Sequence, residues 1–320
     1  MDADVNLRIL EMLVDGVPPV TIVDSINQAG LDIREAILAI GAFGPKLRES
    51  ARRREACKDH AYWMAGVRRG LDKWPRTIPC VTTMEAAHFY REYYAVNRPI
   101  FFETVTDDAS PFAWSFERIQ REMGEHIVEV MRNRAGGKPD YIDPQDHRSL
   151  LPLSEFVDEI QSVETNDVYL TAYNHGIVGP LGDVLSDFFP LNHLMDQKNA
   201  MDASLWMGPK GAMSPLHYDK TNVVIVQLLG TKRVVLLAPY EERFLYHDDT
   251  TLTSPINPCA PDIKAFPSFR FAKSSEIVLT EGSALFVPVG WWHFVESLAP
   301  SLSLSMSNFC APNYFPASLF

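Results

Sequence analysis

The second half of the chain is a series of short apolar segments separated by turns, and this pattern limits the possible folds most narrowly. From Asp167 onward the segments are rich in β-branched and aromatic residues, which are typical of strands. We predict strands at 168–172, 204–207, 222–229, 233–238, 276–279, 284–287, 294–298 and 302–307. About eight short strands at such spacing favour a barrel or a jelly roll.

The clearest strand runs from Ser301 to Ser307, where serine alternates with leucine and methionine. Alternation with a period of two predicts one apolar face and one small, polar face. The segment from Tyr240 to Lys273 has little periodicity and contains four prolines, so we interpret it as a long insertion. Long insertions in compact domains are more often functional than accidental.

Helical patterns dominate the first part of the chain. Residues 1–75 are predicted as a helical region, with helices at about 7–14, at 33–40, at 46–71, and from Pro18-Pro19 to a stop at Gly30. A basic stretch, 46–54, opens the helix at 46–71 and is interpreted as a solvated helix face, with a contact for an acidic partner or RNA as the alternative. Thr82 and Glu85 suggest a capping box for a helix to about Tyr94, and another helix is expected from Ser115 to about Met123. A strand is expected at 100–102, and the second domain at 76–320 with its barrel core at about 165–310.

Two separated motifs carry the candidate chemistry. His217-Tyr218-Asp219 places an imidazole and a carboxylate on one face of a strand, about 6–7 Å apart. His293, in Trp291-Trp292-His293, can supply a third ligand from another strand. Two histidines and one carboxylate occupy one face of an octahedral ion, and this set suits non-haem Fe(II).

The residues around these motifs resemble a known family. The window runs from Ser214-Pro215-Leu216 through Gly230 and Lys232-Arg233 to Phe286-Val287-Pro288 and Ser307-Asn308-Phe309. It is similar to the JmjC/cupin-8 family of Fe(II)- and 2-oxoglutarate-dependent oxygenases, nearest in pattern to the asparaginyl-hydroxylase-like branch. The resemblance covers roughly residues 97–314, about two thirds of the chain. It implies a mainly β fold with α, a double-stranded β-helix of the cupin type, with the helical region before it.

The resemblance also implies the roles of the site residues. His217, Asp219 and His293 would bind Fe(II), and Lys232 and Tyr169 would hold the distal carboxylate of 2-oxoglutarate, with O₂ as the second cosubstrate. Three further residues are expected near the cosubstrate: Ser214, Asn222 and Asn308. The Trp291-Trp292 pair, Pro288 and Gly290 are interpreted as structural.

Some residues depart from the pattern of that family. Gly282-Ser283 stands where Gly-Asp is common, at a turn, so no loss of chemistry is expected. Cys310 replaces an aromatic residue, and Leu252-Thr253 stands where asparaginyl hydroxylases have Arg-Gln. These two changes argue against an asparaginyl substrate and leave the metal and cosubstrate residues intact.

The composition of the chain limits the classes of partner that it can bind. The net charge of −12 disfavours nucleic acid and anionic membranes, although a local basic patch stays compatible with it. Four cysteines without C-x-x-C spacing indicate reduced thiols, and neither a signal segment nor a membrane span is recognised, so we expect a cytoplasmic protein.

The predicted activity is hydroxylation of a C–H bond on a protein or peptide side chain. Demethylation would be the same step on an N-methyl group. A small molecule or a tRNA base is an alternative substrate, and a non-catalytic metal-binding cupin module is an alternative class, as is a metal cupin of isomerase or simple dioxygenase type. The helical region is open to three interpretations: peptide docking, homodimer formation or capping of the barrel.

Overall fold

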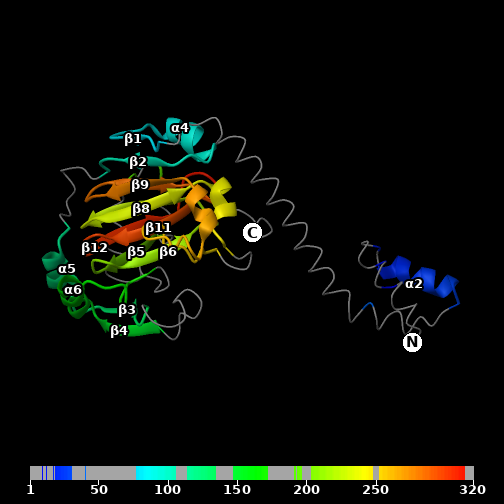
Figure 1. Ribbon diagram of the computed structural model, residues 1–320, viewed down its shortest axis with the longest axis horizontal. Coiled ribbons are helices and arrows are strands. Elements are labelled where there is room, and N and C mark those ends of the chain that lie inside the picture. The colour runs from blue at the N-terminus through cyan, green and yellow to red at the C-terminus, as the bar shows by residue number, and fades with distance from the viewer. Residues whose placement is uncertain are drawn as a thin grey trace. The chain divides into compact units, whose positions relative to one another are not determined.

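The structure, a computed structural model, describes residues 19–30, 77–105, 114–134, 147–171, 203–247 and 252–313, with positions 9, 12, 17, 40, 191 and 193–196 (Figure 1). The chain divides into two compact units, Met1–Gly66 with Phe315–Phe320, and Val67–Tyr314. The domain boundary predicted at residues 75 and 76 stays a prediction. In the part of the chain that the structure describes, no helix is long and apolar enough to cross a membrane.

In the first unit, helix α2 spans Pro19–Gln28. Ile22 and Ile26 lie one turn apart on its buried face and cluster with Ile9. Gly30 has a φ of +72°, which glycine adopts freely, and the helix predicted to stop there is confirmed. The other predicted helices of the 1–75 region lie almost wholly outside the described residues.

Two sheets face each other in the second unit. The large sheet has the strand order β1-β2-β10-β7-β12-β5. Its strands are β1 (Cys80–Val81), β2 (Ile100–Phe102), β10 (Ala284–Val287), β7 (Val223–Leu229), β12 (Ser301–Met306) and β5 (Ala203–Gly208). The small sheet has the order β6-β11-β8-β9. Its strands are β6 (Met213–His217), β11 (Trp292–Ser297), β8 (Lys232–Leu237) and β9 (Ser274–Leu279).

The chain crosses between the sheets repeatedly from β5 to β12, and these strands pair antiparallel. This is the jelly-roll arrangement that the spacing of the strands predicted. Eight of the nine expected strands, including the one at 100–102, match the structure within two residues at each end. The ninth, expected at 168–172, forms only single bridges at Tyr169 and Leu170 among its described residues. Among the described residues, the prediction omitted four strands, β1, β3 (Ile127–Met131), β4 (Arg148–Pro152) and β6.

The two sheets bury three groups of apolar side chains. Between the sheets, Ile225 and Leu285 of the large sheet pack with Val234, Leu236 and Val295 of the small one. The outer face of the large sheet forms a larger core with helices α4 (Ala86–Phe89) and α6 (Leu153–Ser162). The outer face of the small sheet is covered by the 240–273 insertion, which forms short 3₁₀ turns at Pro239–Phe244 and Pro267–Phe271.

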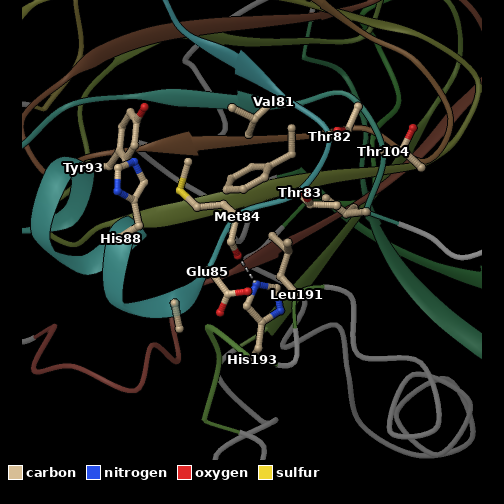
Figure 2. Close-up of a pocket in the computed structure, with 13 residues that line it drawn as sticks. Val81, Thr82, Thr83, Met84, Glu85, His88, Tyr93, Thr104, Leu191 and His193 are labelled. Atoms are coloured by element: carbon tan, nitrogen blue, oxygen red, sulfur yellow. Dashed lines mark hydrogen bonds between the residues drawn. The ribbon is translucent and has the colours of Figure 1, made fainter.

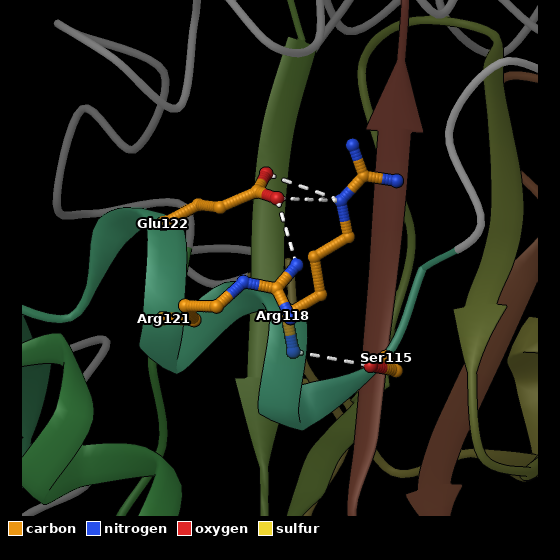
Figure 3. A network of polar contacts seen from close by, with 4 residues as sticks. All are labelled: Ser115, Arg118, Arg121 and Glu122. Atoms are coloured by element: carbon orange, nitrogen blue, oxygen red, sulfur yellow. Dashed lines mark hydrogen bonds and ion pairs between the residues drawn. The ribbon is translucent and has the colours of Figure 1, made fainter.

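Helix α5 (Phe116–Met123) begins where the sequence predicts. The Ser115 side chain accepts a hydrogen bond from the backbone N–H of Arg118, and Glu122 pairs with Arg118 and Arg121 along the helix (Figure 3). The capping box predicted at Thr82 and Glu85 is wrong: Glu85 is the N-cap of α4 but makes no side-chain capping bond. That helix continues as a π-helical turn, Tyr90–Tyr94.

We predict that Gly230→Ala, in the turn between β7 and β8, destabilises this domain by about 2–4 kcal/mol in urea unfolding. Gly230 has a φ of +69°, and a Cβ there would lie 2.1 Å from the carbonyl oxygen of Pro300. Gly211→Ala is the matched control, because its φ is +87° but its nearest contact would be 3.4 Å away. The free energy of unfolding of Gly211→Ala should fall by only about 1 kcal/mol, the cost of a left-handed backbone for alanine. Equal losses in the two variants would contradict the prediction.

Candidate metal centre

His217, Asp219 and His293 converge at one end of the small sheet. His217 ends β6 and lies directly opposite His293 of β11, with the ring centroids 4.1 Å apart. The Asp219 carboxylate oxygens lie 3.9 Å from His217 Nε2 and 3.6 Å from His293 Nε2. Among the described residues, these three side chains could together bind a metal ion. One ligand atom from each lies within 4.8 Å of the other two.

Asp219 reaches this position from outside the strand, which corrects the expectation that it shares a strand face with His217. β6 ends at His217, and the backbone N–H of Tyr218 bonds to Leu252 in the insertion. The Asp219 carbonyl accepts a hydrogen bond from the N–H of Gly290, 3.1 Å away, in the turn before β11. The carboxylate is therefore positioned by a turn-to-turn contact and not by strand alternation.

Both imidazoles have Nε2 toward the carboxylate. His217 Nδ1 lies 2.7 Å from the Pro215 carbonyl oxygen, and His293 Nδ1 lies 3.0 Å from that of Trp291. These contacts favour the tautomer with the proton on Nδ1, which leaves a lone pair on each Nε2. Burial, together with the nearby His217, lowers the pKa of His293 to about 4 against the opposing effect of Asp219. His293 is thus neutral near pH 7, as a metal ligand must be.

Two asparagines hold the turn that carries His293. The Asn222 side-chain oxygen accepts a hydrogen bond from the N–H of Val289, and the Asn97 side-chain nitrogen donates to the Val289 carbonyl. Asn97 also accepts from the Trp291 indole N–H, and its φ of +57° is one that asparagine tolerates. Asn222 was predicted near the cosubstrate. In the structure its side-chain oxygen bonds to the backbone of the turn before His293.

Lys232 is buried between the sheets. It begins β8, only 1% of its surface is exposed, and its amine lies 3.1 Å from the Tyr169 hydroxyl. An amine carries three donors, and within the described part of the chain only Tyr169 accepts from it. Arg233 faces the other way and pairs with Glu276 and Glu296, as strand alternation predicts.

Lys232 shares the inner face of the small sheet with His293. Lys232 lies opposite Ser297, and His293 lies opposite Leu236. The four-residue offset corresponds to about 13 Å along the strands. Lys232 and the triad are therefore at different depths of the same interior.

Ser214 faces the same interior because of a β-bulge. Its spacing of three from His217 would place the two on opposite faces of a regular strand. The ladder is irregular between His293 and Val295, so that His217 lies opposite His293 while Ser214 lies opposite Val295. An extra residue in one strand changes the face of every later side chain, and here it brings Ser214 inward.

The interior around Lys232 is polar. Ser301 and Ser303 of β12 are buried, with Ser303 donating to Gln227 of β7, and Ser297 bonds to Ser301. The small, polar face predicted for this strand therefore points between the sheets and not into solvent. Buried hydroxyl groups are costly in an apolar environment, so this lining suits a polar ligand.

Asn308, the last of the predicted cosubstrate residues, lies just after β12. Its side-chain nitrogen donates to the carbonyl of Asp196, while its side-chain oxygen is buried without a partner among the described residues. Three further residues around the site were not predicted from the sequence. Arg134 and Gly208 contact Tyr169, and Asn97 holds the turn before His293. The only sequence signal for Asn97 is its place before Arg98-Pro99.

A separate cavity of about 1150 Å³ lies on the other side of the large sheet (Figure 2). Val81 and Phe102 line it from β1 and β2, and His193 contacts the Met84 carbonyl at its rim. Phe102 belongs to the outer core of the large sheet. This cavity is therefore distinct from the interior that contains Lys232 and the triad.

The two facing sheets and the His-Asp-His group at one end of the small sheet define a jelly-roll protein with a site able to hold a metal ion. The chain belongs to the cupin-like domain family, whose sequence profile matches residues 86–314.

Three relatives illustrate the range of similarity. Lysine-specific demethylase 8 of Xenopus tropicalis is 29% identical over 237 residues, 71% of this chain and 52% of that protein. Jumonji C domain-containing protein 5 of Drosophila melanogaster is 38% identical over 113 residues, 34% of this chain and 28% of that protein. HSPB1-associated protein 1 of Homo sapiens is 39% identical over 109 residues, 32% of this chain and 22% of that protein.

The chain spans about half the length of the demethylases it matches. Proteins of this JmjC type are 2-oxoglutarate-dependent oxygenases that use Fe(II). The resemblance identified in the sequence is thereby confirmed at the level of the family.

We predict that Asn222→Ala weakens binding of Co(II), a spectroscopic substitute for Fe(II), by roughly tenfold, because partners that orient a ligand typically contribute that much. The variant leaves the N–H of Val289 without its acceptor and loosens the turn before His293. Asn257→Ala is the control, since its side chain accepts from the N–H of Cys259 in the insertion. Unchanged Co(II) affinity in Asn222→Ala would show that the asparagine does not position the site.

Proposed function

We propose that this protein is an Fe(II)- and 2-oxoglutarate-dependent dioxygenase that hydroxylates a C–H bond on a protein or peptide side chain. The observation that carries the proposal is the buried Lys232 amine, which shares an interior face with the triad and forms no ion pair with a carboxylate among the described residues. A buried amine of this kind needs an anionic partner. The distal carboxylate of 2-oxoglutarate meets that need.

The separation of the two groups supports this choice of cosubstrate. The offset between His293 and Lys232, about 13 Å along the strands, can be spanned by a flexible four-carbon side chain and a five-carbon dicarboxylate end to end. The Tyr169 hydroxyl and Ser214 supply further hydrogen-bonding groups on the same interior. A metal cupin of isomerase type would have no use for a buried amine at this depth.

When bound, Fe(II) and 2-oxoglutarate supply with O₂ the oxidising chemistry that converts a C–H bond to an alcohol. The residues of the chain would position the ion and the cosubstrate. His217, Asp219 and His293 would hold the ion. Lys232 and Tyr169 would hold the far end of the cosubstrate, and the apolar residues between the sheets would exclude water.

A protein or peptide substrate is supported by the surroundings of the triad and by the relatives. His217 and Asp219 are partly exposed, and Thr253 of the insertion pairs with His217 at the edge of β6. Some relatives carry the name of a lysine demethylase, and removal of an N-methyl group begins with the same hydroxylation. The net charge of −12 disfavours a tRNA substrate.

The proposal predicts slow conversion of 2-oxoglutarate to succinate by the wild-type protein with Fe(II) and ascorbate and no added substrate. His217→Ala should reduce succinate to the level without protein, because it removes a ligand. His88→Ala, which changes an exposed histidine in the lining of the separate cavity, should retain the wild-type rate. Succinate formation that survives in His217→Ala would contradict the role of the triad.

Binding of the cosubstrate provides a second test. Lys232→Met should weaken 2-oxoglutarate binding about 10- to 100-fold, which corresponds to ~1.5–3 kcal/mol for a hydrogen bond to a charged group. Anaerobic titration of the Fe(II)-loaded protein measures this affinity, and Fe(II) binding itself should be unchanged. If the wild-type protein binds Fe(II) but not 2-oxoglutarate, the oxygenase proposal fails and a non-catalytic metal-binding module is favoured.

A further inference from the structure

We infer that Arg134 is a positioning residue for the cosubstrate, which holds Tyr169 and the strand of Ser214 where both can meet the distal carboxylate. This inference rests on the proposed function. Arg134 is outside every motif of the sequence. Its role follows from what its guanidinium touches.

The backbone directs Arg134 toward the interior. β3 ends at Met131, and Asn133 has a φ of +56°, a left-handed conformation that asparagine tolerates. Arg134, half-buried, then extends so that its guanidinium carbon lies 5.1 Å from the centre of the Tyr169 ring. A guanidinium at this distance stacks favourably on an aromatic face.

The same guanidinium fixes the start of β6. One nitrogen donates to the side-chain oxygen of Asn166, 2.7 Å away, and the other donates to the carbonyl of Met213, 2.8 Å away. The Asn166 oxygen also accepts from the Met213 N–H at 2.8 Å. Both backbone groups of Met213, the neighbour of Ser214, are therefore held by Arg134 and Asn166.

The Tyr169 ring is also confined by Gly208. A Cβ at Gly208 would lie 2.6 Å from Tyr169 Cδ2, so the ring packs directly on the glycine backbone. Trp206, two residues earlier in β5, lies 5.9 Å from the ring centre to centre. With Arg134 and Gly208 fixing the ring, its hydroxyl is held 3.1 Å from the Lys232 amine.

A neighbouring arginine shows what a purely structural role looks like. Arg132, two residues earlier, forms a two-bond ion pair with Glu159 of α6 at 2.7 and 2.6 Å. That pair ties the β3–β4 hairpin to a helix. The contacts of Arg134 given above instead involve Tyr169 and the residue beside Ser214, and Arg132 therefore serves as a matched control.

The test compares two 2-oxo acids on Fe(II)-loaded protein under anaerobic conditions. 2-Oxoglutarate carries the distal carboxylate, whereas 2-oxopentanoate has the same keto-acid end without it. Arg134→Gln should weaken 2-oxoglutarate binding about tenfold and leave 2-oxopentanoate and Fe(II) binding unchanged. Arg132→Gln should lower the melting temperature without changing the ratio of the two affinities.

Arg134→Lys keeps the charge but lacks the planar fork, so it should show the same selective loss and serves if the glutamine variant does not fold. Equal weakening of both 2-oxo acids, or no weakening of either, would overturn the positioning role while the proposed function stands. If the wild-type protein binds neither 2-oxo acid in the presence of Fe(II), the proposed function itself fails.

Discussion

The burial of the Lys232 amine between two sheets is the constraint on which the rest of the interior depends. An amine taken out of water at 1% exposure must be met by polar groups, and the chain surrounds it with the Tyr169 hydroxyl and the buried serines of β12. The polar half of the interior then lies beside an apolar half built from Val234, Leu236 and Val295. This division gives the interior one region suited to an anion and one that excludes water.

Much of the fold could be predicted, because strands buried on both faces and bounded by turns are visible in the sequence. β10 was predicted at its observed bounds, and β12 was recognised from its alternation. β6 was omitted because Ser214 and Pro215 interrupt its short apolar pattern. The helix expected to end at about Tyr94 does end there, through α4 and its π-helical turn, but the capping box at Thr82 and Glu85 that was expected to open it does not form.

The candidate site was predictable where chemistry concentrates in short motifs. The two short motifs that contain His217, Asp219 and His293 indicated which side chains would meet, and the family resemblance pointed to Lys232. The structure brings the three together and places Lys232 on the same inner face as His293. Sequence spacing could not supply the bulge that turns Ser214 inward. Nor could it supply the contact of Arg134 with Tyr169, because that contact depends on how a hairpin far from the barrel motifs packs. Asn222 was expected beside the cosubstrate, whereas in the structure its side chain bonds to Val289 in the turn before His293.

The pairing of β2 with β10 has a consequence for how the protein is made. Phe102 lies opposite Ala284, so a strand synthesised early finds its partner only when the end of the domain has emerged. β5 likewise waits for β12, with Gly208 opposite Ser301. Folds dominated by such distant pairings form slowly and expose unpaired edges meanwhile. A truncation shortly before β10 would therefore remove both β10 and β12, so that β7 and β5 would have no partner in the large sheet and β2 would keep only β1. The nascent chain would then be prone to aggregate.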